Sequence, residues 1–183
     1  RVDIAAQGSL ALRSACKNGD MQLFRLLLEH SDEHSLDMNV DNGAPLRNAC
    51  RHGHLELVRA LLALTGPLAV DPSAKDYGAL RAACGQNKLD VVKELFDNGG
   101  CASVDVASTA WHGAFGAACA AGHDDVVRDL LERSAQQCAD AGGVDLTRGF
   151  MVAFSGFHFS TAYLVLQLGN TAHDAVPKFL ARL

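Results

Sequence analysis

Basic residues are scarce in this 183-residue sequence, and their scarcity excludes one class of partner. Lysine and arginine number 16 against 21 aspartate and glutamate residues, and the formal net charge is −5. No run of basic residues is longer than two. Nucleic-acid binding needs lysine and arginine side chains clustered on one face. We therefore expect no nucleic-acid partner.

Motifs for catalysis, phosphate binding and metal binding are missing as well. The sequence has no Cys-x-x-Cys pair, no glycine-rich phosphate loop and no Gly-x-Ser-x-Gly elbow. His52 and His54 flank a glycine, but a zinc ion wants four convergent ligands, and the repeat described below accounts for His54. We expect no catalytic residue, no metal site and no cofactor.

The chain is repetitive, with a period of 34 residues. Its apolar markers are spaced 34, 34, 35 and 35 residues apart, at Leu12, Leu46, Leu80, Phe115 and Phe150. Each unit reads as an extended turn, a short helix ended by a glycine turn, and a second helix with an apolar stripe at helical spacing. A fixed period of this length is typical of a solenoid, and we predict an all-α fold.

The period divides the sequence into five predicted repeats followed by a tail. The repeats cover about residues 1–35, 36–69, 70–103, 104–143 and 144–169, and the tail covers 170–183. The loop Ser134–Gly143 is longer than the equivalent earlier loops. The extended turn that precedes the first helix of each repeat, which we call the finger, is nearly deleted in the fifth repeat. We expect the tail to form a short capping helix or to begin a further repeat.

These motifs resemble the ankyrin-repeat family over about residues 2–169. The matching pieces are Ala44-Pro45-Leu46, the run Gly53-His54-Leu55-Glu56-Leu57-Val58, and Leu61-Leu62. Arginine replaces the family's usual histidine at Arg13, Arg47 and Arg81, and the period is 34 rather than 33. The resemblance implies a helical solenoid with protruding fingers that binds proteins and has no catalytic activity.

Cysteine occurs in one column of the repeat, directly after alanine in an apolar helical stripe, at Cys16, Cys50, Cys84 and Cys119. Stacked repeats place such residues about 10 Å apart, which is too far for a disulfide. We expect buried free thiols and a reducing, intracellular compartment; the cytoplasm is favoured, and a nuclear or organellar location stays open. Cys101 and Cys138 fall in predicted loops, where we expect exposure.

The arginine column has two interpretations. Three guanidinium groups in register would form a ladder for an acidic partner. Alternatively, each arginine hydrogen-bonds loop carbonyls of the adjoining finger, which its five donors suit well, and we favour this interpretation. The column ends where Gly116 and Met151 replace arginine.

Binding residues follow from the resemblance, which implies that a protein partner docks on the concave side, against finger tips and the edge of the first helix. Carried onto this chain, the site comprises Lys17, Asn18, Asp41, Arg51, His52, Lys75, Tyr77, Gln86, Trp111 and His112. Trp111 is the only tryptophan, and aromatic residues on fingers are typical interface anchors. Equally, Trp111 can fold down and cover a neighbouring finger.

The fifth repeat is unusually apolar. No charged residue occurs between Arg148 and Asp174, yet polar residues interrupt this run, so it is not a membrane span. A terminal solenoid repeat normally shows a polar face to water. We therefore expect a cover, which is the folded-back tail with Val176, Phe179, Leu180 and Leu183, or further repeats, or a partner subunit.

The sequence thus predicts a non-catalytic module for protein–protein interaction, acting as a scaffold or adaptor. Two alternatives remain. The chain is a structural subunit of a larger complex, or it is a regulatory segment of an enzyme whose catalytic part lies elsewhere.

Overall fold

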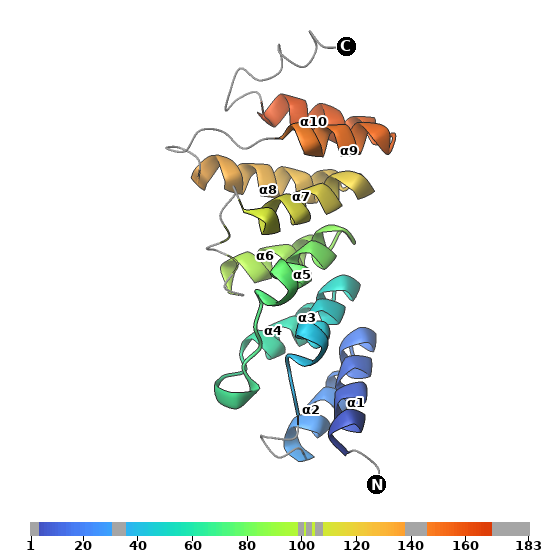
Figure 1. Ribbon diagram of the computed structural model, residues 1–183, viewed down its shortest axis with the longest axis vertical. Helices are drawn as coiled ribbons and strands as arrows, with labels where there is room; N and C mark the ends of the chain where they lie inside the picture. Colours follow the sequence, from blue (N-terminus) through green and yellow to red (C-terminus); the bar gives the residue numbers. More distant parts are fainter. Residues whose placement is uncertain are drawn as a thin grey trace. The chain divides into compact units, whose positions relative to one another are not determined.

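The computed structural model describes residues 4–30, 36–98, 101, 104, 108–137 and 146–169, which form helices joined by turns (Figure 1). No strand occurs among these residues, and the predicted all-α fold is confirmed. The chain divides into two compact units, Arg1–Ser103 and Val104–Leu183. Cys138, most of the loop before the fifth repeat and the tail 170–183 lie outside the described residues.

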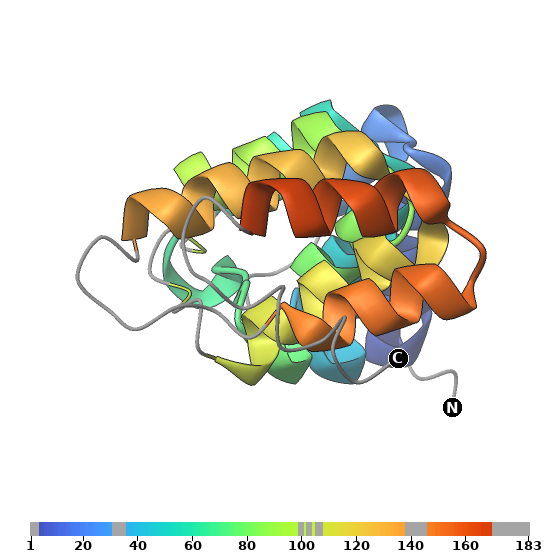
Figure 2. The ribbon, with the colours of Figure 1, turned by 90° about the horizontal axis from the view of Figure 1, so that it is seen from above.

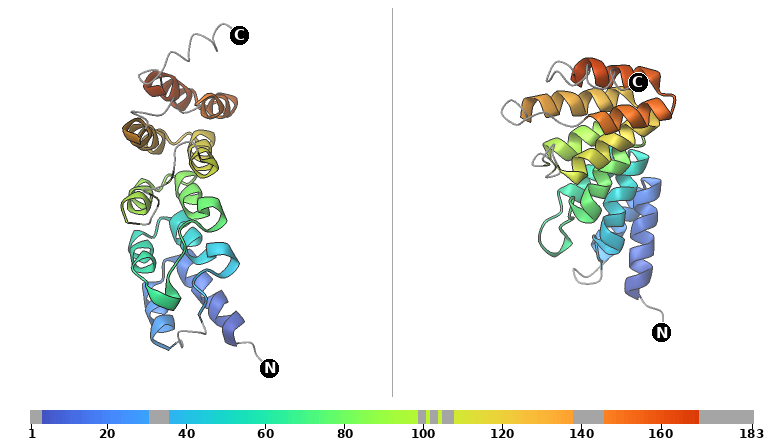
Figure 3. Two further views of the ribbon diagram at one scale, coloured as in Figure 1. Left: turned by 60° about the vertical axis from the view of Figure 1, so that its left-hand side comes forward. Right: turned by 45° about the horizontal axis from the view of Figure 1, so that its top comes forward.

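The first unit contains three antiparallel helix pairs. Their bounds are Ile4–Asn18 (α1) with Met21–His30 (α2), Val40–His52 (α3) with Leu55–Leu62 (α4), and Ala74–Cys84 (α5) with Leu89–Asp97 (α6). A short 3-10 helix, Gly66–Leu68 (η1), lies between the second and third pairs. Helix α3 contacts α1 and α5, and α4 contacts α6. Within this unit the first helices form one layer and the second helices another (Figure 3).

The second unit contains two helix pairs. They are Thr109–Ala121 (α7) with Asp124–Gln137 (α8), and Thr147–Ser155 (α9) with Phe159–Gly169 (α10). Helix α9 packs on α7 and α10 packs on α8, as the yellow-to-red ribbons of Figure 2 show. The five pairs agree with the predicted period, whereas the repeat boundaries themselves stay a prediction.

One element is longer than the sequence indicated. The prediction of a loop from Ser134 onward is wrong for residues 134–137, because α8 continues to Gln137. The Ser134 side chain is buried, and its hydroxyl donates to the Leu131 carbonyl oxygen at 2.7 Å. A serine that satisfies its hydroxyl on its own helix does not end that helix.

A left-handed residue joins the two helices of every pair. Gly19, Gly53 and Gly122 have φ values of 74°, 80° and 70°, which confirms the predicted glycine turns. The same position holds Asn87 in the third pair and Phe157 in the fifth, with φ values of 54° and 62°. Asparagine tolerates this conformation, but a bulky side chain rarely adopts it.

Within each unit, the residue after a turn packs against the turn of the preceding helix pair. His54 Nε2 lies 3.0 Å from the Lys17 carbonyl oxygen, which confirms that His54 fastens a turn. Its ring lies so close to Gly19 that a Cβ there would be 2.5 Å from His54 Nδ1. His158 packs against Gly122 in the same way within the second unit.

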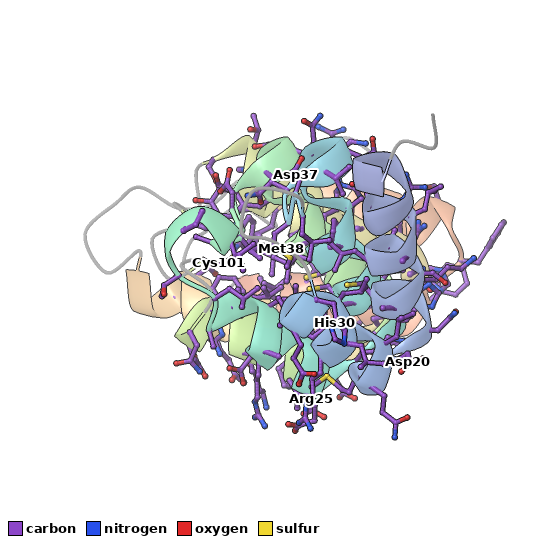
Figure 4. All side chains as sticks on the ribbon, turned by 90° about the horizontal axis from the view of Figure 1, so that it is seen from below. Asp20, Arg25, His30, Asp37, Met38 and Cys101 are labelled. Carbon is purple, nitrogen blue, oxygen red and sulfur yellow. The ribbon has the colours of Figure 1, made fainter. Side chains whose placement is uncertain are left out.

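The core follows the columns of the repeat. The four column cysteines are fully buried and free, as predicted. The prediction of an exposed Cys101 is wrong, because its side chain is only 1% exposed. Figure 4 shows Cys101 and Met38 inside the first unit, whereas Arg25 points outward. The core of the first unit therefore includes Cys101, which follows the last helix of that unit, α6.

Candidate functional site

Most of the predicted binding residues lie on the surface of the first unit. Lys17, Asn18, Arg51, His52 and Gln86 are exposed at or just after the carboxyl ends of the first helices. Asp41 and Lys75 are exposed in the two fingers, and Tyr77 is half-buried beside Lys75. Equivalent positions of successive repeats thus offer polar side chains to solvent.

Basic side chains gather where the first and second helices of each pair meet, forming a basic cluster of Lys17, Arg51, His52, His54 and Lys88. The rings of His52 and His54 stack with centroids 6.0 Å apart. Partial desolvation lowers the pKa of His52, and repulsion from the neighbouring His54, Lys17, Arg51 and Lys88 side chains lowers it further. Lys17, Arg51 and His52 suit this place because the carboxyl end of a helix carries partial negative charge, whereas His54 and Lys88 stand at the N-caps of α4 and α6.

Sequence reasoning missed two members of this cluster as site residues. His54 was assigned only a structural role, and Lys88 was not singled out. Lys88 stands one period after His54, so the repeat phase was the signal that could have found it.

Each finger of the first unit contains three consecutive left-handed residues. They are Asp41, Asn42 and Gly43 at the start of α3, and Lys75, Asp76 and Tyr77 at the start of α5, with φ values between 51° and 74°. Five of these six residues are not glycine, so the backbone is strained at these two fingers. Strained backbone in an ordered loop is typical of functional sites.

Hydrogen bonds between the fingers hold this conformation. The side chain of Asn39 connects the two fingers. Its Nδ2 donates to the Ala69 carbonyl oxygen at 2.9 Å, and its Oδ1 accepts from the backbone N–H of Asp71 at 2.8 Å. Asp71 in turn accepts from the Ser73 amide at 2.9 Å. Each finger is therefore braced by its neighbour, and its tip is presented in one arrangement.

The arginine column is tied to the fingers. Arg47 donates to the Asn42 carbonyl oxygen at 2.9 Å and more weakly to that of Asp41 at 3.4 Å, both in its own finger. Arg13 pairs with the Asp41 carboxylate of the following finger. The expected carbonyl bonds therefore occur at Arg47, but in its own finger rather than the adjoining one. These two guanidinium groups brace the fingers and do not form a ladder.

Trp111 is a core residue, and its prediction as an exposed anchor needs correction. The side chain is 1% exposed and stacks on Phe115, with ring centroids 4.7 Å apart. Ser108 caps α7 by accepting from the Trp111 amide at 3.2 Å, which turns the indole inward. Phe115 replaces the leucine of earlier repeats and supplies the flat surface on which the indole stacks.

His112 lies beside a shallow groove of about 460 Å³ in the second unit. Its Nδ1 is 2.7 Å from the Ser108 carbonyl oxygen, and Arg148 of α9 also lines the groove. The groove exists partly because Gly116 replaces the column arginine, and a Cβ there would meet no atom within 4 Å. His112 is the one predicted site residue that the second unit leaves on its surface.

The five cysteines of the described residues are not placed for nucleophilic chemistry. Burial raises the pKa of Cys16 and Cys101 to about 12, and burial together with the charge of Asp124 does the same for Cys119. Among the described residues, no three His, Cys, Asp or Glu side chains are grouped to hold a metal ion. None of the helices in that part of the chain is both long and apolar enough to cross a membrane.

Comparison with known families agrees with this architecture. Residues 2–76 match the family described as ankyrin repeats (3 copies). No curated protein matches the chain. Residues 2–76 therefore carry ankyrin repeats, and the all-α fold of the described residues is consistent with an ankyrin-repeat solenoid. Ankyrin repeats generally mediate protein–protein interactions.

Proposed function

We propose that this chain is a non-catalytic scaffold or adaptor module that binds an acidic surface of a partner protein. The partner docks on the first unit, against the two fingers and the basic cluster. The observation that carries the proposal is the gathering of three cations, Lys17, Arg51 and Lys88, around His52 and His54 in a chain whose net charge is −5. Like charges held close together favour an oppositely charged partner.

The fingers supply shape to this surface. Asp41 is engaged by Arg13, so the tip of its finger is fixed before binding. Lys75 adds a cation from the next finger, and Tyr77 adds an aromatic edge that is half-buried. A surface that is ordered in advance loses little conformational entropy on binding.

The thiols support an intracellular setting for this module. Five free cysteines are buried in the core of the described residues. Reduced thiols persist in the cytosol, where glutathione and thioredoxin keep them reduced.

A charge-reversal comparison tests the proposal. The binding variant is Lys17→Glu/Arg51→Glu/Lys75→Glu, and its control is Arg25→Glu/Lys93→Glu/Arg128→Glu, which makes the same charge change at exposed positions of second helices. Both are used as baits in extract of the native cell, and bound proteins are quantified against the unsubstituted chain. We expect the binding variant alone to lose its specific partner. Equal loss with both variants, or retention by both, contradicts the proposed surface.

A further inference from the structure

In the first unit, an arginine side chain lies between the first helices of two successive pairs. Arg47 of α3 passes beside Gly78 of α5, where a Cβ atom would be 3.5 Å from Arg47 Cδ. Its guanidinium group then donates to two carbonyl oxygens of its own finger, those of Asn42 at 2.9 Å and Asp41 at 3.4 Å. The space between these two helices is therefore occupied, and the donors of the arginine are used within the chain.

In the second unit, arginine and glycine have exchanged these two places. Gly116 of α7 is equivalent to Arg47, because each directly follows the apolar marker of its repeat. Arg148 of α9 is equivalent to Gly78, because each stands two residues before that marker. The arginine thus belongs to the following helix instead of the preceding one.

The exchange leaves an open groove between α7 and α9. Its volume is about 460 Å³, within the range of about 300–1,000 Å³ that is usual for ligand sites. A Cβ atom at Gly116 would meet no atom within 4 Å, so the place of the missing arginine side chain is open. The described residues that line the groove are Thr109, His112, Gly113 and Gly116 of α7 and Arg148 and Val152 of α9, and none of the six is acidic. We call it the Arg148 groove.

Arg148 differs from Arg47 in what its own repeat offers it. Five positions separate Asp145 from the apolar marker of the fifth repeat, whereas nine separate Asp71 from that of the third. The shortened finger lacks the residues whose carbonyl oxygens Arg47 uses. Arg148 is exposed, and among the residues that the structure describes none forms a hydrogen bond or an ion pair with it. Its guanidinium donors are therefore available to a ligand.

His112 is held in one orientation beside the same groove. Its Nδ1 lies 2.7 Å from the Ser108 carbonyl oxygen. Because a carbonyl oxygen can only accept, Nδ1 carries the proton and Nε2 is the nitrogen left for a ligand. The ring also packs edge-on against the buried Trp111, with centroids 5.4 Å apart and an interplanar angle of 83°. The groove thus contains a fixed imidazole in addition to the guanidinium group.

We propose that the Arg148 groove binds an extended acidic segment of a partner protein, which takes the place of the shortened finger. An aspartate or glutamate carboxylate of the segment pairs with the Arg148 guanidinium group, as Asp41 pairs with Arg13 in the first unit. A backbone N–H of the segment donates to Nε2 of His112. The lack of a side chain at Gly116 lets the main chain of the segment approach α7 closely.

Protein is favoured over nucleic acid as the occupant because the groove contains few cationic groups. A nucleic acid is bound through several phosphates, which lysine and arginine side chains neutralise. The Arg148 groove contains one arginine, and its histidine suits a peptide main chain. The groove belongs to the second unit, so the proposal does not depend on the surface proposed for the first.

Nuclear magnetic resonance on the full chain tests the groove with a defined probe. The probe is a capped peptide with the sequence of residues 37–46, the finger that the column arginines bind in the first unit. We expect the backbone signals of Gly116 and Arg148 to shift on titration. The peptide with Asp37→Asn/Asp41→Asn should bind about tenfold more weakly, because neutral amides replace the carboxylates of a charge-assisted pair.

Variants of the chain locate the binding. Arg148→Gln should abolish the difference between the two peptides, whereas Arg148→Lys should retain part of it, since lysine keeps the charge but not the planar fork. Arg128→Gln is the matched control, at an exposed arginine of α8. Gly116→Leu should block the peptide without changing any charge. Circular dichroism checks that each variant keeps its helices.

Several results overturn the proposal. They are the absence of shifts at Gly116 and Arg148, equal binding of the two peptides, and binding of the acidic peptide by Arg148→Gln as tight as that by Arg128→Gln. Shifts confined to the basic cluster of the first unit also overturn it, because the peptide would then have taken another site. A short thymidine oligonucleotide is titrated in parallel, and its tighter binding at Gly116 and Arg148 would assign the groove to nucleic acid instead.

Discussion

Phe115 of α7 lies directly against Gly149 of α9. A Cβ atom at Gly149 would be 2.2 Å from Phe115 Cε1, well inside van der Waals contact. In the first unit, Leu46 occupies the position equivalent to Phe115, and Ala79 occupies the position equivalent to Gly149. The larger ring in the second unit is therefore accommodated by removing a methyl group from the facing helix, as expected for close-packed interiors.

Substitution of Gly149 by alanine should destabilise the fold. We expect a loss of about 1–3 kcal/mol in the free energy of unfolding, because the added methyl group overpacks the contact with Phe115. Gly116→Ala is the matched control, since a Cβ there meets open space and alanine raises helix propensity by about 0.5–1 kcal/mol.

Urea denaturation of the variants measures this coupling. Phe115→Leu should make Gly149→Ala much less costly, because leucine restores the combination found in the first unit. A Gly149→Ala penalty that is unchanged by Phe115→Leu would show that the two side chains do not interact.

The two glycine turns of the first unit should differ in their tolerance of alanine. Both Gly19 and Gly53 are left-handed, so each substitution costs about 1–2 kcal/mol in backbone strain. At Gly19 the neighbour is the His54 ring, held by the Lys17 carbonyl oxygen, whereas at Gly53 it is the flexible end of Lys88. Gly19→Ala should therefore be the more destabilising of the two in thermal unfolding. Equal effects would contradict the role of His54 as a fixed contact.

The described cysteines should react slowly with Ellman's reagent. Cys16, Cys50, Cys84, Cys101 and Cys119 are all buried in the folded protein. The pKa of about 12 at Cys16, Cys101 and Cys119 keeps their thiolate fraction very small at pH 8. At most one thiol, that of Cys138, should react before unfolding. Rapid reaction of four or more thiols in the native protein would refute the buried column.

Partner binding should strengthen as the pH falls. Partial desolvation and the neighbouring basic side chains lower the pKa of His52, which favours its neutral form in the free protein. An acidic partner raises this pKa in the complex, so binding takes up a proton and is favoured below the complexed pKa. Affinity should rise by up to about tenfold for each pKa unit of that shift.

Titration calorimetry between pH 7.5 and 5.5 measures this effect, with His52→Gln as the variant expected to flatten it. His54, Lys17, Arg51 and Lys88 surround the same group and are left unchanged in that variant. A pH dependence that His52→Gln leaves intact would assign the proton to another residue.

The features that could be predicted from the sequence are those that recur with the period of the repeat. The first four positions of a column share their burial, and so the leucine and cysteine columns, the helix pairs and the glycine turns were predictable. Trp111 occurs once and has no column to report on it, so only the structure places its ring on Phe115. Cys101 likewise lies in a linker whose burial depends on packing rather than on local pattern.

The fingers show a second limit of sequence reasoning. Asp41-Asn42-Gly43 contains residues that tolerate left-handed backbone. The sequence Lys75-Asp76-Tyr77 does not by itself indicate this conformation. The conformation of both depends on hydrogen bonds from Asn39 and Arg47, one of which spans 30 residues. Such long-range bonds have no local signature.

Hydrogen exchange on the chain with and without its captured partner tests the central claim most directly. The account predicts slower exchange in the partner complex at the finger residues 40–43 and 74–77 and at the helix ends around Lys17 and His52. The second helices α2, α4 and α6 should exchange at the same rate in both states. Protection confined to those second helices, with unchanged fingers and helix ends, would contradict the proposed binding surface.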